Sequence, residues 1–212
     1  MGCSGLLKRL LSVLMLGAVL PAAASPQLRS SFPGRRVGGG TRGECTARLL
    51  VHLVPQNSVF APDVDRLLGT LQGPTQAPKP LLMDLRRLAS AGTVAGAKNR
   101  VQRIRLDPSP VGVTLFRAPL ADGVVWESSY QCLEPNSGVD PLSWDGGFDA
   151  PPAITLLLAE PTPVDLSLQE RLKALANRCD GSVAKAQLIQ DFNLAPLDLS
   201  SWPDRLPLRC LF

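Results

Sequence analysis

The chain has 212 residues, of which 45% are hydrophobic, so it is long enough for one domain with a sizeable core. Its formal net charge of +4 is close to neutral for this length, which argues against a protein that coats nucleic acid. Because the chain has 1 histidine, a zinc centre with several histidine ligands is excluded.

The first 24 residues are predicted to be a secretory signal peptide. Lys8 and Arg9 precede an apolar run over residues 10–20, and small residues follow before Ser25. The run is too short to span a bilayer core of about 30 Å, which needs roughly 20 residues. We expect cleavage between Ala24 and Ser25, with no transmembrane span left after cleavage. The alternative is that the segment is retained as an uncleaved anchor.

Residues 25–44 are predicted to form an extended lead-in to a β domain. Alternating apolar and polar residues over 46–54 indicate a first strand, with His52 on its polar face. Residues 63–71 are predicted to form a short helix with an apolar face of leucines, whereas residues 81–88 fit either a strand or a helix. Loops are expected over 89–97 and 134–152, and the other predicted strands are Val101–Leu106, Val111–Ala118, Gly123–Cys132 and Ile154–Ala159.

After residue 160 the apolar residues no longer alternate with polar ones but recur at the spacing of a helix. Ser167 and Glu170 match a capping box, in which each side chain satisfies a backbone donor at a helix start. Apolar residues then recur at helical spacing up to Cys179, and the Asp-Gly pair that follows ends the helix. We expect a second helix over 183–192 and a last turn over 202–206.

Four cysteines remain in the predicted mature chain, and an even number in an exported protein indicates two disulfides. Cys45 and Cys132 each lie on the predicted buried face of a strand, which favours a disulfide bridge between them. Cys179 and Cys210 then form the second bridge. Four cysteines allow three pairings, so the connectivity stays open at this point.

These elements predict an α+β fold. Residues 45–160 form a mainly antiparallel, β-sandwich-like domain of about six strands. Residues 161–212 form a short helical segment that packs on this domain.

Several segments resemble an uncharacterised family of exported cyanobacterial proteins, a domain of unknown function. The opening segment PGRRVGGGTRG is followed by Cys45 and by a strand that ends in LVP. Further likenesses lie in GVTLFRAPL, VVWESSYQC and SSWPDRL, whereas the central PKPLLMDLRRL departs from the family pattern. The resemblance implies export and a β domain with helices behind it, and it supplies no catalytic residues.

The glycines of the opening segment do not form a phosphate-binding loop. Such a loop needs G-x-x-x-x-G-K-[ST] between a strand and a helix, but Gly43 is followed by Glu44 and then by a strand. The glycines are therefore interpreted as a close backbone turn, beside which arginine side chains can still bind an anion. His52 is expected to be exposed to solvent rather than catalytic.

Charge is divided unevenly along the chain. Residues 25–117 carry 14 basic and 5 acidic side chains, whereas residues 118–212 carry 6 basic and 13 acidic ones. One interpretation is that the two halves neutralise each other, or that the cations are simply solvated. The other is a basic surface that docks an anionic envelope component, either lipid headgroups or acidic polysaccharide. The candidate anion-binding residues are Arg35, Arg36, Arg42, Arg86, Arg87, Arg100, Arg103 and Arg105.

The sequence favours a periplasmic or secreted, non-enzymatic binding or structural module. The alternative is an envelope hydrolase that uses a carboxylate pair such as Glu127 with Asp145 or Asp149. The aspartates of residues 140–149 do not have the spacing of a calcium loop, so no metal is expected. No cofactor is expected either.

Overall fold

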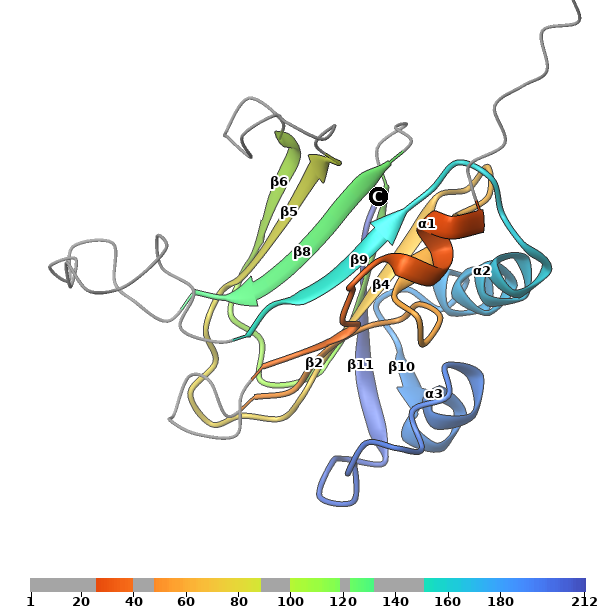
Figure 1. Ribbon diagram of the computed structural model, residues 1–212. Helices are drawn as coiled ribbons and strands as arrows, with labels where there is room; N and C mark the ends of the chain where they lie inside the picture. Colours follow the sequence, from red (N-terminus) through yellow and green to blue (C-terminus); the bar gives the residue numbers. More distant parts are fainter. Residues whose placement is uncertain (1–25, 40–47, 89–99, 119–122, 132–150) are drawn as a thin grey trace, which may run out of the picture.

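The computed structural model describes residues 26–39, 48–88, 100–118, 123–131 and 151–212. It is a sandwich of two β-sheets with helices packed against one of them (Figure 1). This architecture confirms the predicted α+β, sandwich-like fold. Of the 11 described strands, eight lie within residues 45–160, where about six were predicted. The additional two are the two-residue strand over 59–60 and the strand over 67–72, which was predicted as a helix.

The five-stranded sheet has the order β3-β9-β8-β5-β6. Its pairs are antiparallel, except that β3 runs parallel to β9. The bounds are β3 Val59–Phe60, β5 Leu81–Arg87, β6 Arg100–Leu106, β8 Val124–Tyr130 and β9 Ala153–Leu157. The undecided segment over 81–88 is therefore a strand.

The six-stranded sheet has the order β1-β2-β4-β7-β11-β10. Its pairs are antiparallel, except that β11 runs parallel to β7. The bounds are β1 Val37–Gly38, β2 Leu50–His52, β4 Leu67–Gln72, β7 Gly112–Arg117, β10 Ser182–Ala184 and β11 Arg205–Leu211. The two sheets meet around Trp126, whose ring lies edge-on to Phe116 with centroids 5.3 Å apart.

Helices cover the outer side of the six-stranded sheet. They are α2, Pro163–Ala176, and α3, Lys185–Asp191, while the short α1, Pro26–Ser31, precedes the first strands. Gly69 of β4 permits close packing here, because a Cβ on it would lie 3.1 Å from Leu172 of α2. The lead-in joins both sheets, since Arg35 pairs with Ile154 of β9 and Val37 pairs with Val51 of β2.

The predicted helix over 63–71 is wrong, because residues 67–72 form the central strand β4. All six residues of β4 are buried, with the other sheet on one side and α2 on the other. A strand buried on both faces does not alternate between apolar and polar residues. The spacing of its leucines therefore matched the apolar face of a helix.

Two details of the C-terminal prediction are also wrong. Helix α2 starts at Pro163, with the capping box formed by Thr162 and Asp165 instead of Ser167 and Glu170. The predicted second helix is a strand over its first residues and a helix only from Lys185. The predicted last turn leads directly into β11, so this segment contributes two strands as well as helices.

The predicted bridge between Cys179 and Cys210 is confirmed, with Cα atoms 5.6 Å apart. It ties β11 to the segment that follows α2. The predicted bridge between Cys45 and Cys132 lies outside the described residues. In the part of the chain that the structure describes, no helix is both long and apolar enough to cross a membrane.

Candidate functional site

Most of the predicted anion-binding arginines lie together on the outward face of the five-stranded sheet. Residues that pair directly across strands share one face of a sheet. One such row runs from Arg35 through Ile154, Glu127 and Asp84 to Arg103. Neighbouring rows add Arg86, Arg100 and Arg105. We call the surface formed by Arg35, Arg86, Arg100, Arg103 and Arg105 the basic face.

A β-bulge is needed to bring these arginines together. Arg100 and Arg103 are three residues apart, so a regular strand would place them on opposite faces. The register shifts between Leu85 and Arg86, so that Arg86 pairs with Arg100 while Asp84 pairs with Arg103. The alternation of residues along a regular strand does not predict that Arg100 and Arg103 lie on the same face.

Asp84 is the centre of the basic face. Arg103 donates two hydrogen bonds to its carboxylate, from Nε to Oδ1 and from Nη2 to Oδ2, each of 2.7 Å. Arg86 donates from Nη2 to Oδ2 at 2.9 Å, and Arg100 Nε lies 3.2 Å from Oδ1. The Asp84 side chain is 3% exposed, whereas those of the three arginines are 31–43% exposed. One buried carboxylate thus holds three accessible guanidinium groups in place.

The pKa of Asp84 reflects this environment. Burial raises the pKa of the carboxyl, but the hydrogen bonds from Arg103 and Arg86, together with the positive charges of Arg103 and Arg100, lower it overall. Asp84 is therefore ionised at neutral pH. The face retains excess positive charge, because five arginines surround the two carboxylates of Asp84 and Glu127.

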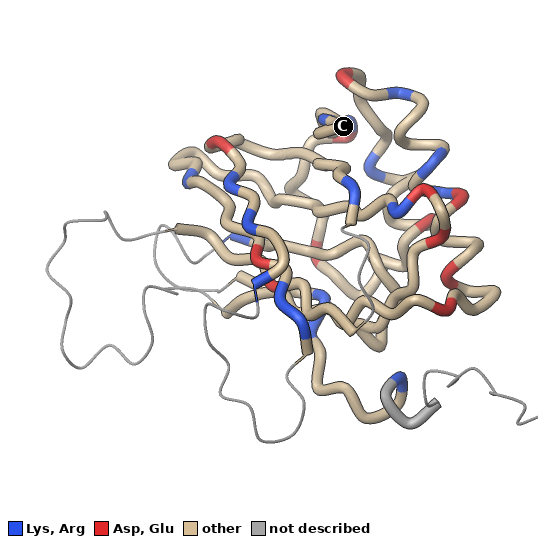
Figure 2. Tube along the Cα trace, turned by 90° about the horizontal axis from the view of Figure 1, so that it is seen from above, with Lys and Arg blue, Asp and Glu red and all other residues tan. Residues whose placement is uncertain are grey.

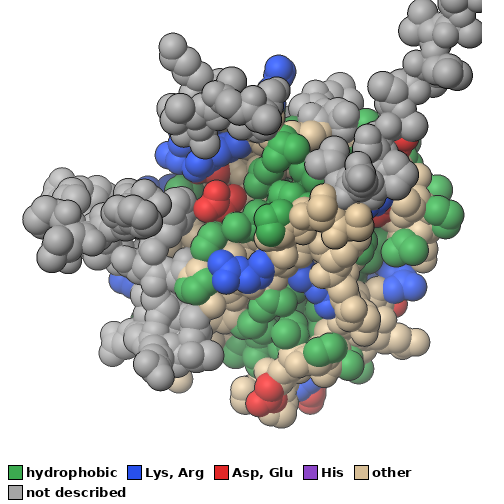
Figure 3. All heavy atoms as spheres, viewed as in Figure 1, with side chains coloured by type: hydrophobic (Ala, Val, Ile, Leu, Met, Phe, Trp, Pro, Cys, Tyr) green, Lys and Arg blue, Asp and Glu red, His purple; other side chains and the backbone are tan. Residues whose placement is uncertain are grey.

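The space-filling view shows basic side chains gathered around an acidic one on this face, beside hydrophobic side chains (Figure 3). In the Cα trace, basic positions follow neighbouring strands on the sheet side, whereas the helical side carries acidic and basic positions together (Figure 2).

The other three predicted arginines do not join the basic face. Arg36 is buried, and its guanidinium donates to the carbonyls of Val54, Phe192 and Asn193 at 2.8–3.0 Å. Arg36 therefore links the lead-in to the end of α3, which corrects its proposed anion-binding role. Arg87 is exposed but pairs with the inward residue Val124, and Arg42 lies outside the described residues.

The carboxylate pair proposed for a hydrolase is not formed by described residues. Glu127 pairs across the strands with Asp84, while Asp145 and Asp149 lie outside the described residues. Burial raises the pKa of Glu127, Arg86 opposes this rise and Asp84 adds to it. Since guanidinium groups bind both oxygens of Asp84, that carboxylate is unsuited to acid–base chemistry.

His52 is buried rather than exposed, contrary to the prediction. Its Nδ1 lies 2.8 Å from Thr155 Oγ1, and its Nε2 lies 2.8 Å from Ser128 Oγ. Because the imidazole and Ser128 have no solvent exposure, this pair is a structural contact between the sheets and not a catalytic dyad. The prediction failed because β2 is covered on both faces, so alternation along it does not separate buried from exposed residues.

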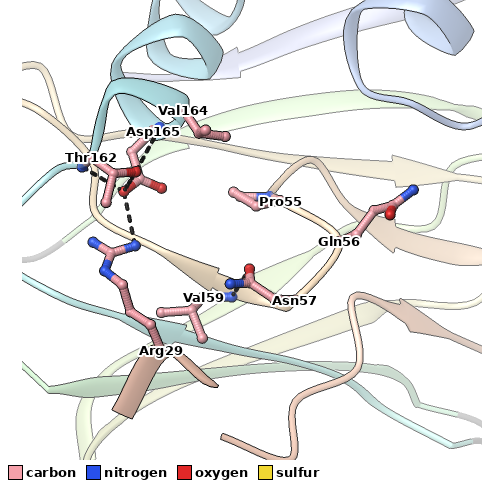
Figure 4. Close-up of a pocket in the computed structure, with 8 residues that line it drawn as sticks. All are labelled: Arg29, Pro55, Gln56, Asn57, Val59, Thr162, Val164 and Asp165. Atoms are coloured by element: carbon pink, nitrogen blue, oxygen red, sulfur yellow. Dashed lines mark hydrogen bonds and ion pairs between the residues drawn. The ribbon is translucent and has the colours of Figure 1, made fainter. Parts of the chain in front are cut away.

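A small hollow of about 200 Å³ lies between α1, the loop over residues 55–57 and the start of α2 (Figure 4). Arg29 points across it and forms a 3.0 Å ion pair with Asp165, whose carboxylate also caps α2. Arg29 and the helix cap engage only Oδ2 of Asp165, whereas Oδ1 has no hydrogen-bond partner among the described residues. The hollow lies at the joint between α1 and α2. Within the described ranges, no three potential metal ligands gather at one point.

No family model, curated protein or solved structure matches this chain. The resemblance to exported cyanobacterial proteins therefore stays a prediction. The interpretation of function depends on the site geometry.

Proposed function

We propose that this protein is an exported, non-enzymatic binding module of the cell envelope whose basic face docks an anionic partner. The arrangement around Asp84 supports this proposal, because it presents three guanidinium groups from two adjacent strands. Arginine forks of this kind bind carboxylate, sulfate or phosphate oxygens with defined geometry.

Acidic polysaccharide fits the basic face better than lipid headgroups. A surface that docks on a bilayer usually adds apolar side chains that enter the headgroup boundary. The large apolar side chains that the described part of the chain exposes are Val64, Leu88, Val164, Leu166, Leu211 and Phe212. Of these, only Leu88, which directly follows β5, adjoins the five-stranded sheet, so the described part of this face offers much charge and little exposed apolar surface.

Chromatography on immobilised heparin tests the proposal. The oxidised protein is expected to be retained at low salt and released as salt screens the contacts. Arg105→Glu changes an exposed arginine of the face without removing a partner of Asp84, and should elute at lower salt. Arg178→Glu, on the helical side, makes the same charge change and should elute with the parent protein.

Two results would contradict the proposal. One is that the parent protein passes through heparin at low salt. The other is that both variants lose retention equally, which would show that net charge alone is responsible. Parallel flotation with phosphatidylglycerol vesicles separates the two kinds of partner, because stronger binding to vesicles than to heparin would assign the face to lipid.

A further inference from the structure

A groove of about 300 Å³ runs along the open edge of the sandwich and shares Arg105 with the basic face. Ile104 and Leu106 of β6 form one side, and Arg209 and Leu211 of β11 form the other. Buried polar side chains of the six-stranded sheet, Gln72 and Thr114, line it as well. The groove therefore has apolar walls with polar groups between them, as ligand-binding grooves commonly do.

The edge of β6 borders this groove. Among the described strands, β6 pairs only with β5 and is the last strand of its sheet. An edge strand presents backbone N–H and C=O groups that another extended segment can pair with. At seven residues, β6 is long enough to form several such bonds.

Side chains alternate along this edge in a way that matches an added strand. Ile104 and Leu106 pair with the inward residues Met83 and Leu81, so they face the groove. Arg103 and Arg105 face outward, where they meet Asp84 and Leu82. A segment added beside β6 would place every second side chain in the groove and the others beside arginines.

The charges at the groove identify the kind of segment. Arg105 and Arg209 border it, are exposed and form no ion pair with any described residue. Asp107 is the one carboxylate in the groove lining. Arginines along the edge also disfavour a second copy of the same edge, because like charges would face each other.

We propose that the edge of β6 binds an extended segment of a partner protein in which acidic and apolar residues alternate. Apolar side chains of the segment enter the groove against Ile104, Leu106 and Leu211. Acidic side chains on its other face meet the outward arginines of β6. This is recognition by strand addition, in which backbone bonds give affinity and alternate side chains give specificity.

A capped, fluorescently labelled heptapeptide in which Glu and Val alternate tests the proposal against the oxidised protein. We expect saturable binding by anisotropy, and slower hydrogen exchange of amides in β6. A peptide of the same composition with its Glu residues in one block should bind about tenfold more weakly, because it cannot present the two faces. Equal binding of the two peptides, or no binding at low salt, would overturn the proposal.

Variants in β11 locate the site. Arg209→Glu should weaken binding of the alternating peptide about tenfold. Arg205→Glu is the matched control, since it lies on the same face of the same strand but outside the groove lining. Equal effects of the two substitutions would overturn the assignment. Heparin retention separates this site from the basic face, because Arg209→Glu should weaken it no more than Arg205→Glu does.

Discussion

The imidazole of His52 stacks on the indole of Trp126, with ring centroids 3.5 Å apart and ring planes within 9° of parallel. His52 comes from β2 and Trp126 from β8, so the stack joins the two sheets at the centre of the sandwich. Both side chains are fully buried. Burial lowers the pKa of His52 well below 6.5, so the ring is neutral at physiological pH.

This stack predicts that the protein loses stability in mild acid. The unfolded chain binds a proton at His52 below about pH 6.5, whereas the folded chain does not until its lower pKa is reached. The free energy of unfolding should therefore fall as pH drops through this window, by up to about 1.4 kcal/mol per pH unit. Urea unfolding between pH 5 and pH 8 measures the slope.

His52→Gln is the control for this effect. It removes the titrating ring, so the slope between pH 5 and 6.5 should flatten even if the variant is less stable overall. An unchanged slope would show that other groups cause the acid sensitivity.

Neutralising Asp84 is expected to destabilise the protein while leaving the fold intact. Asp84→Asn leaves Arg86, Arg100 and Arg103 close together without their shared carboxylate, and we expect a loss of about 1–3 kcal/mol in the free energy of unfolding. Urea denaturation at pH 7 measures it. Asp107→Asn, an exposed carboxylate, should change stability by less than about 0.5 kcal/mol.

The pH dependence gives a second measurement of the same interaction. Because the pKa of Asp84 is lowered in the folded state, its contribution is present above the unfolded value near 4 and is lost as pH falls through the folded pKa. The difference in stability between the parent protein and Asp84→Asn should therefore stay constant at neutral pH and shrink as pH falls below the unfolded value near 4. A difference that instead shrinks between pH 7 and pH 5 would contradict the role assigned to the carboxylate.

The sequence predicted the sandwich because the aromatic strand around Trp126 alternates and short apolar runs are bounded by turn residues. The segment over 111–118 is β7 almost as predicted, although both of its faces are buried. Prediction failed at β4. Leu67, Leu68 and Leu71 of β4 are all buried although they lie on both faces, so their spacing gave no period-two signal.

The sequence predicted which arginines belong to the candidate site, but not how they are arranged around Asp84. The acid-free run of cations between Asp84 and Asp107 identified β5 and β6 correctly as the source of positive charge. It could not show that Asp84 accepts hydrogen bonds from Arg86 and Arg103 and forms an ion pair with Arg100, because that depends on a bulge and on strand pairing. Arg36 looked equivalent to Arg35 in the sequence, but the next residue along a strand points to the opposite face.

Removing the bridge between Cys179 and Cys210 is expected to lower stability by about 2–4 kcal/mol. The bridge joins residues 31 apart in the chain, so it restricts a loop in the unfolded state that includes α3. The double variant Cys179→Ser with Cys210→Ser avoids leaving a reactive thiol. Differential scanning calorimetry should show a lower Tm, and an unchanged Tm would contradict a stabilising role.

Truncating Leu172 should separate α2 from the six-stranded sheet. Leu172 is fully buried, and its side chain is one of those packed over Gly69 of β4. Leu172→Ala is expected to cost about 2–5 kcal/mol, because the cavity lies between rigid elements. Leu166→Ala on the same helix is the matched control, since Leu166 is 44% exposed and should lose little. Equal losses in the two variants would contradict the packing role of Leu172, because alanine has the higher helix propensity and does not by itself destabilise a helix.

Export and oxidation are tested together by the intact mass of the protein recovered from its native host. Cleavage after Ala24 predicts a chain that starts at Ser25 and retains Cys45, Cys132, Cys179 and Cys210. Because Cys179 and Cys210 form one bridge and the remaining pair is predicted to form another, the mass should lie four hydrogens below that of the reduced chain. Reduction and alkylation should then label four thiols. A full-length species that labels five thiols without reduction would contradict both export and the proposal of an envelope binding module.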